Sequence, residues 1–312
     1  MTEAGAQLRQ SWPQAVVDPP VGTPIAASAD RRAVRNAMSV DVEDYFQVQA
    51  FAGHISRADW DRLPSRVERN TDRVLEIFGG HGIRATFFTL GWIAERNKGL
   101  VRRIVESGHE LASHGLEHTP IFGQTKDQFR ADVRTTKRLL EDIGGTAVIG
   151  YRAASFSLSA KTPWAFDVLA DEGYHYSSSI YPIRHDHYGM PDAPRVPFRP
   201  LGGSFLEIPL STLSLFGRNL PISGGGYFRL LPYAVSRWAL RRLNVHDGQP
   251  GIFYFHPWEI DFEQPRQQQA PLKSRLRHYL NLERMEARLS QLLRDFAWDR
   301  MDRLFLRRDP RP

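Results

Sequence analysis

The amino-acid sequence predicts an α/β fold in which helices cover a mainly parallel sheet or barrel. Short apolar runs rich in β-branched and aromatic residues alternate along the chain with amphipathic helical segments, the pattern of repeated strand–helix units. Four polar residues, Asp41, His114, Arg152 and His256, stand at the carboxyl ends of predicted strands. Because these ends form one face of a parallel barrel, where active sites lie, we expect the four side chains to meet there.

The predicted elements follow one another from residue 37 onward. The first strand begins at residue 37 and runs into a cluster of carboxylates, and further strands are expected at 85–90, 110–113, 148–152, 174–180, 205–209 and 251–255. Helices are expected at 66–78, 97–107, 126–143, 163–172, 232–243 and 282–296. Residues 182–200, rich in Pro, His and Arg, are predicted to form a long functional loop. Residues 224–226, a run of three glycines, lack the Lys-Ser/Thr of a phosphate-binding loop and are predicted to be a turn.

The length of 312 residues suits one barrel domain with an extension at each end. Residues 1–36 contain several prolines and arginines without sustained periodicity and are predicted to be a flexible leader. Residues 37–300 are predicted to form the domain, and residues 301–312 a basic C-terminal tail. No apolar run approaches the ~20 residues of a membrane span, and the N-terminus lacks the apolar core of a signal peptide. We therefore expect a cytoplasmic location.

Charge and cysteine content narrow the possible functions. Lys and Arg total 41 against 35 Asp and Glu, a net charge of +6, with basic residues dispersed except near the C-terminus. This distribution is typical of a solvated basic surface, and no aromatic-basic module is visible, so no nucleic-acid partner is expected. The chain has no cysteine, which excludes disulfides and thiolate chemistry and leaves histidines and carboxylates as ligands for any metal.

The stretch from Ser113 to His118 has the spacing of a metal site. His114 and His118 are four residues apart, so a tight loop after a strand can bring both imidazoles to one point. Glu117 directly precedes the second histidine, whereas a zincin metalloprotease needs its glutamate directly after the first. The histidine pair is therefore expected to belong to a different kind of metal site.

The first strand supplies acidic groups for such a site. Asp41, Glu43 and Asp44 are crowded at its end, where three carboxylates repel one another unless a cation or hydrogen-bond donors balance them. Asp41 also lies within the apolar pattern of the strand, which is unusual for a surface carboxylate.

Five stretches of the chain resemble, in order, the polysaccharide deacetylase family with the NodB homology domain, a group similar to carbohydrate esterase family 4. They read SVDVED, SHGLEH, YRAASF, YSSSI and FYFHPWE, and the resemblance covers roughly residues 37–300. Within the family, the chain resembles the branch associated with exopolysaccharide and exosortase (PEP-CTERM) loci. The resemblance implies a distorted (β/α) barrel of about seven parallel strands, in agreement with the alternation of strands and helices.

The resemblance also implies a divalent metal. His114 and His118 match the two metal histidines of the family, with zinc expected and cobalt, nickel or manganese also compatible with such ligands. The first family motif is usually Asp-Asp, but here Val42 stands where the second Asp, a metal ligand, would be. Glu43, on the same strand face as the first Asp, and Asp44, in the following loop, are both candidates for the acidic ligand, with a slight preference for Glu43.

Three residues match catalytic positions of the family. Asp41 matches the base, Arg152 matches the arginine that pairs with this base and keeps it ionised, and His256 matches the general acid. The sequence departs from the family where Ser177 replaces an aspartate of the fourth stretch and where Pro257 replaces the aspartate usually next to the general acid.

These matches imply a metal-dependent hydrolase that removes acetyl groups from N-acetylhexosamine units of an exopolysaccharide or its precursor. The expected partner is such an N-acetylated polysaccharide or oligosaccharide, and peripheral association with a membrane or exopolysaccharide assembly machinery is compatible with the sequence. Candidate substrate-binding residues are the aromatics near the predicted site, Tyr45, Tyr188, Tyr227 and Trp258. Two alternatives stay open: a metal-independent, allantoinase-like hydrolase of C–N bonds, and a catalytically inactive carbohydrate-binding barrel.

Overall fold

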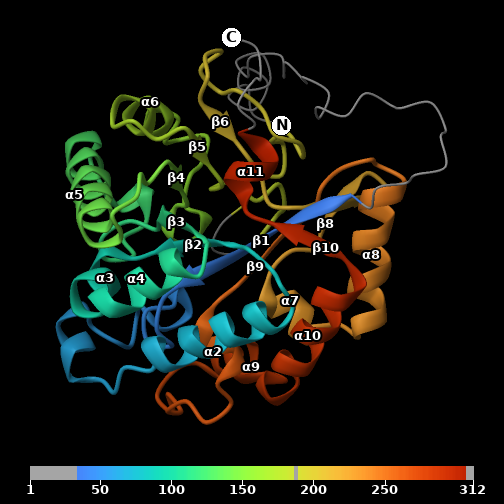
Figure 1. Cartoon of the computed structure of the whole chain (residues 1–312), viewed down its shortest axis with the longest axis horizontal. Helices are drawn as coiled ribbons and strands as arrows, with labels where there is room; N and C mark the ends of the chain where they lie inside the picture. The colour runs from blue at the N-terminus through green and yellow to red at the C-terminus, as the bar shows by residue number, and fades with distance from the viewer. Residues whose placement is uncertain (1–33, 186–188, 307–312) are drawn as a thin grey trace.

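A parallel sheet forms the centre of the protein. The computed structural model describes residues 34–185 and 189–306 (Figure 1). Within these residues, seven parallel strands follow the order β9-β1-β2-β3-β4-β5-β6, and the short strand β10 also pairs with β1 in parallel. The bounds are β1 (Arg35–Val42), β2 (Thr86–Thr89), β3 (Glu110–Ser113), β4 (Gly150–Tyr151), β5 (Tyr176–Ser177), β6 (Leu206–Glu207), β9 (Ile252–Phe255) and β10 (Ala297–Asp299). The predicted barrel-like arrangement of about seven parallel strands is confirmed.

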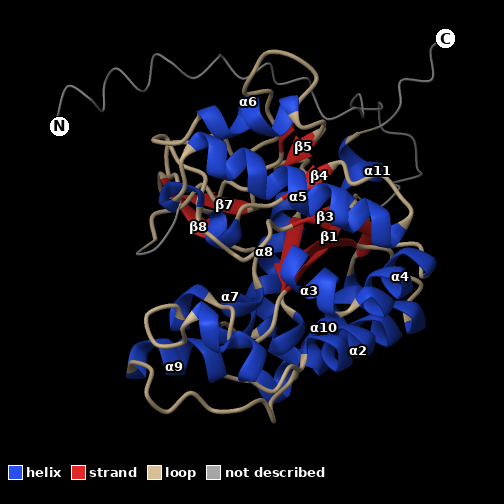
Figure 2. Ribbon diagram, turned by 90° about the vertical axis from the view of Figure 1, so that its left-hand side faces the viewer, coloured by secondary structure: helices blue, strands red, loops and turns tan. Residues whose placement is uncertain are grey.

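Helices cover the outside of this curled sheet (Figures 1 and 2). They are α2 (Val67–Gly80), α3 (Gly91–Arg96), α4 (Lys98–Glu106), α5 (Lys126–Gly144), α6 (Trp164–Asp171), α8 (Tyr233–Val245) and α10 (Met285–Asp295). Local sequence sets their ends: α5 begins with a capping box between Thr125 and Gln128 and ends at Gly145, whose φ of 61° suits glycine. Within the described residues, no helix has both the length and the apolar character needed to cross a bilayer.

Three segments differ from the sequence-based expectations. Residues 224–226 do not form a simple turn, because Gly224 adopts a φ of 97° and α7 (Gly225–Leu230) begins directly after it. Residues 212–221 form an unpredicted antiparallel hairpin of β7 (Thr212–Leu215) and β8 (Arg218–Pro221). A further helix, α9 (Leu272–Tyr279), lies beside α7 on one flank of the molecule (Figure 2).

The ordered fold extends beyond the predicted domain boundary at residue 300. Helix α11 (Met301–Phe305) packs against β1, and the Met301 side chain is fully buried. The Met301 backbone N–H donates a 2.8 Å hydrogen bond to Oγ1 of Thr86. The prediction of a tail over residues 301–312 is therefore wrong for its first part, because buried Met301, the apolar side chains that follow it and the backbone N–H groups of Met301 and Asp302 hold this segment on the sheet. Residues 307–312, and residues 1–33 of the predicted leader, lie outside the described residues.

Candidate active site

The register of the sheet brings the predicted strand-end residues together. Asp41 and His256 follow paired residues of β1 and β9, and His114 and Arg152 follow paired residues of β3 and β4. A pocket of about 500 Å³ opens at these strand ends. Its lining includes the polar residues Asp41, Glu43, His114, His118, His256 and Glu259. The side chains of β1, β3 and β9 thus meet on one face, as the parallel arrangement predicts.

Glu43, His114 and His118 form a buried group of potential metal ligands. One ligand atom from each residue lies within 4.8 Å of the others. Oε2 of Glu43 lies 3.2 Å from Nε2 of His118, yet this oxygen accepts no hydrogen bond from any described residue. Lone pairs that converge in a buried site without donors are stabilised by a cation, and two imidazoles with one carboxylate suit zinc. The residues present therefore fit a divalent metal.

The surroundings of His114 suit a neutral metal ligand. Its Nδ1 lies 2.9 Å from the backbone oxygen of Arg152, so Nδ1–H donates to this carbonyl and Nε2 keeps its lone pair. Burial lowers the pKa of His114 to about 4, which keeps the imidazole neutral near pH 7. A neutral imidazole with a fixed tautomer is the form that binds a metal.

Asp44, the alternative acidic ligand, points away from this group. Its Oδ2 accepts hydrogen bonds from the backbone N–H groups of Arg66 and Val67 at 2.7 and 3.1 Å and from the Ser65 hydroxyl at 2.8 Å. Its Oδ1 accepts from the N–H of Tyr45. Asp44 therefore satisfies donors at the start of α2, and the geometry favours Glu43 as the third ligand.

Asp41 forms a buried ion pair with Arg152. Oδ1 of Asp41 lies 2.6 Å from Nη1 of Arg152, and both side chains are almost completely buried. The guanidinium also donates to the Ser39 hydroxyl and to the backbone oxygen of Ser178, and it stacks 4.0 Å from the centre of the Phe88 ring. These contacts hold Arg152 behind Asp41, so the arginine fixes the orientation of the carboxylate from outside the pocket lining.

His256 lies between two carboxylates. Its Nε2 is 2.9 Å from Oε1 of Glu43, and its Nδ1 is 2.8 Å from Oε1 of Glu259. Glu259 is fully buried, and its other oxygen forms a 2.8 Å ion pair with Nε of buried Arg229. The predicted general acid is therefore held at the end of an Arg229–Glu259–His256 chain of charge-assisted hydrogen bonds.

The two carboxylates also set the charge of His256. Burial alone would lower its pKa, but Glu43 and Glu259 outweigh burial and raise the pKa to about 10. Burial likewise opposes ionisation of Glu43, whereas His118 and His256 lower the Glu43 pKa to about 2. His256 thus carries a proton near pH 7 while His114 is neutral, so the environment separates their roles.

The predicted substrate-binding aromatics do not all reach the pocket. Tyr227 and Trp258 line it, and the Trp258 indole stacks on the His256 ring with centroids 5.1 Å apart. The prediction for Tyr45 is wrong, because its side chain is fully buried and packs edge-on against Phe46 in the core. Tyr188 lies outside the described residues.

Three further residues of the pocket lining were not predicted from the sequence: Arg229, Glu259 and His278. The His278 ring stacks on the Trp258 indole with ring centroids 4.1 Å apart. The spacing of Glu259, three residues after His256, was a usable signal, because it allows both side chains to share one helical turn. Arg229 gave no local signal, since it follows the glycine run and reaches the site only through the tertiary fold.

Comparisons with known proteins match two adjoining parts of the chain. Residues 59–176 match the polysaccharide deacetylase family model, and residues 178–306 match a domain of unknown function, DUF3473. The two histidines of the metal group lie in the first part, whereas His256, Glu259 and Arg229 lie in the second. The pocket therefore draws on both parts.

Curated relatives match parts of the chain, and one solved structure shares its fold. The chain is 31% identical over 77 residues to a peptidoglycan-N-acetylglucosamine deacetylase of Bacillus cereus, covering 25% of this chain and 28% of the relative. It is 28% identical over 131 residues to a peptidoglycan deacetylase of Helicobacter pylori, covering 42% and 44%. The chain thus spans less than half the length of these relatives. A Mycobacterium smegmatis protein assigned to the polysaccharide deacetylases superimposes with a TM-score of 0.56 and 20% identity over 90% of this chain and 93% of that one, which shows a shared fold.

Proposed function

We propose that this protein is a metal-dependent hydrolase of acetamide groups on an N-acetylated glycan, a proposal supported by the match of residues 59–176 to the polysaccharide deacetylase family model. The observation that supports this most directly is the buried group of Glu43, His114 and His118 in the same pocket as Asp41 and His256. We propose an exopolysaccharide built from N-acetylhexosamine units, or its precursor, as the substrate. The Bacillus and Helicobacter relatives are named for deacetylation of peptidoglycan, a polymer with such units.

Glu43, His114 and His118 would hold the metal, with zinc as the first candidate. When bound, a divalent cation would polarise the acetamide carbonyl and make water a stronger nucleophile. With Glu43 engaged as a metal ligand, Glu259 would be the carboxylate that holds the proton on Nδ1 of His256. The Arg229 ion pair keeps Glu259 in place for this task.

Asp41 and His256 would move the protons of the reaction. Asp41 is bound to Arg152 through Oδ1 and lines the pocket, so its other oxygen would take a proton from the water that attacks the acetamide carbon. Water first adds to the acetamide carbon and forms the new C–O bond, and the C–N bond then breaks as Nε2 of His256 gives its proton to the departing sugar nitrogen. The products are acetate and a free amino sugar. Tyr227, which is half-buried in the pocket lining, would stack on the sugar ring that carries the acetamide, whereas Trp258, stacked on both His256 and His278, would hold the His256 ring in place.

The proposal is tested by acetate release from N-acetylated chito-oligosaccharides. The metal-loaded protein should release acetate and free amine in equal amounts, and a chelator should abolish this until metal is restored. His118→Ala should lose both metal and activity, whereas His54→Ala, a change of an exposed histidine, should keep both. Full activity in a protein shown to be free of metal would contradict the proposal and favour the metal-independent alternative.

A further inference from the structure

A group of exposed large apolar side chains lies at the mouth of the pocket. We call it the leucine rim, and it consists of Leu230, Phe262, Leu272, Leu276 and Leu280. The exposed fractions are 57% for Leu230, 55% for Phe262, 66% for Leu272, 60% for Leu276 and 37% for Leu280. Exposed apolar groups are normal when scattered, but a contiguous set usually marks an interaction surface.

The members of the leucine rim are neighbours. Leu230, Leu276 and Leu280 line the catalytic pocket, and Leu276 and Leu280 also line an adjoining groove together with Phe262 and Leu272. The three leucines of α9 and its end, at 272, 276 and 280, are four residues apart and therefore lie on one helix face. This apolar face points to solvent instead of to the core, so the fold itself leaves it without a partner within the described residues.

Basic residues alternate with the leucines of the rim. Helix α9 reads LKSRLRHY, with Lys273, Arg275 and Arg277 between the leucines and no acidic residue. Arg266 lines the same groove as Leu272 and stacks on Tyr279 at 4.3 Å. Apolar side chains that insert among acyl chains, flanked by cations that meet anionic headgroups, are the features of a helix that lies on a membrane surface.

We propose that the leucine rim docks on an anionic membrane surface, so that the pocket faces a glycan carried at that surface. This inference rests on the proposed deacetylase function and narrows its substrate to a membrane-associated glycan. The rim is continuous with the pocket through Leu230, Leu276 and Leu280, so a docked protein holds the catalytic group close to the lipid headgroups. A neutral protein partner or a second copy of this positively charged chain offers less charge complementarity to the rim.

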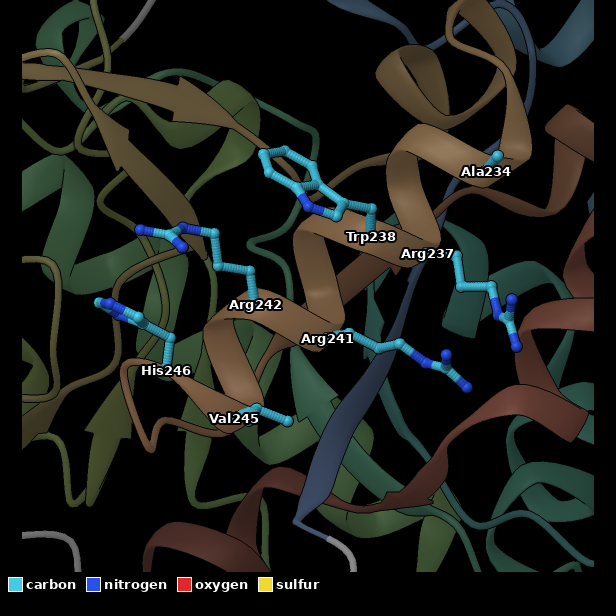
Figure 3. Close-up of a pocket in the computed structure, with 7 residues that line it drawn as sticks. All are labelled: Ala234, Arg237, Trp238, Arg241, Arg242, Val245 and His246. Atoms are coloured by element: carbon cyan, nitrogen blue, oxygen red, sulfur yellow. The ribbon is translucent and has the colours of Figure 1, made fainter.

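A second surface with exposed apolar and basic residues provides an internal control. On α8, Trp238 and Val245 are 51% and 79% exposed, and Arg237, Arg241 and Arg242 lie beside them (Figure 3). This surface has a similar composition but contributes no residue to the catalytic pocket. A general attraction of exposed apolar and basic groups to lipid would use both surfaces, whereas the proposal requires only the leucine rim.

The test is co-sedimentation of the full chain with vesicles of phosphatidylcholine alone or with about a quarter phosphatidylglycerol. The wild-type protein should bind the anionic vesicles preferentially. Phe262→Ser/Leu272→Ser, which changes rim residues outside the catalytic pocket, should weaken this binding roughly tenfold or more. Trp238→Ser/Val245→Ser should bind like wild type. Circular dichroism and melting temperature confirm that each variant is folded.

Several results would overturn the inference: no binding of wild type to anionic vesicles, equal binding to both compositions, or an equal loss in the α8 control. Loss of a concentration-dependent dimer in the rim variant without vesicle binding would assign the rim to a second copy instead. Acetate release from water-soluble chito-oligosaccharides is measured in parallel and should be unchanged in Phe262→Ser/Leu272→Ser. If this release occurs without vesicle binding, only the docking inference fails. If vesicle binding occurs without any release, the proposed deacetylase function fails.

Discussion

Glu259→Gln tests whether the buried carboxylate behind His256 takes part in turnover. Glutamine keeps the size of the side chain but removes the charge that faces Nδ1 of His256 at 2.8 Å and Nε of Arg229 at 2.8 Å. The imidazolium then loses the negative charge that stabilises it, because the amide oxygen of glutamine can accept a hydrogen bond but carries no net charge. Weakened general-acid catalysis should lower kcat about 10²-fold, equivalent to about 2.7 kcal/mol of transition-state stabilisation.

The same substitution should also lower stability. Breaking a buried ion pair by neutralising one partner costs about 3–5 kcal/mol. We expect the lower end of this range, because Arg229 keeps the backbone oxygens of His278 and Leu280 as acceptors at 2.9 and 2.7 Å. A carboxylate that only supports folding would produce this loss of stability without the loss of rate in the folded variant.

The assay compares metal content, melting temperature and initial rates of acetate release below the melting transition. Glu263→Gln is the matched control, since it makes the same change four positions further along the chain at an exposed residue. It should leave the rate and stability unchanged. A folded, metal-loaded Glu259→Gln protein with wild-type kcat would refute a role for Glu259 in holding the general acid.

Three further predictions concern the acidic residues of the fold. Glu43→Gln should abolish metal binding. Asp44→Asn should keep the metal but lower the melting temperature, because Asp44 accepts hydrogen bonds at the start of α2. Metal analysis that shows the reverse would assign the acidic ligand to Asp44. Asp41→Asn should retain metal but lose about 10²–10⁴-fold in kcat, and a near-normal rate would exclude Asp41 as the base. Burial raises the pKa of Glu207 from 4.5 to about 7. Between these two pH values the folded state keeps a proton on Glu207 that the unfolded chain releases. The free energy of unfolding that Glu207 contributes therefore falls by about 1.4 kcal/mol per pH unit from pH 4.5 to 7. Glu207→Gln should therefore become less destabilised, relative to wild type, as the pH rises from 5 to 7 in urea unfolding experiments; a constant difference across this range would contradict the raised pKa.

The sequence alone predicted the architecture and most of the pocket. Alternating strand and helix patterns follow from local residue preferences, and a parallel sheet places all strand ends on one face. This reasoning sufficed to predict that Asp41, His114, Arg152 and His256 lie together, because each is tied to the end of its own strand. The pairing of Asp41 with Arg152, expected from the resemblance, is present at 2.6 Å.

The tertiary structure decided what each polar group contacts. Asp44 and Glu43 are neighbours in sequence, but only the fold brings the N–H groups of Arg66 and Val67 to Asp44 and leaves Glu43 facing the histidines. The position of Tyr45 directly after these acids predicts a place in the site, yet long-range packing puts its side chain in the core.

The support behind His256 also depends on the tertiary structure. Ser177, at a position where the resembled family usually has an aspartate, donates its hydroxyl to Ser179. Glu259 supplies the carboxylate, and its charge is balanced by Arg229, which lies 30 residues away in sequence. Local sequence patterns predict backbone conformation because backbone conformation depends mainly on near neighbours in the chain. The partner of a buried charge is instead the distant group that the fold brings within about 3 Å of it.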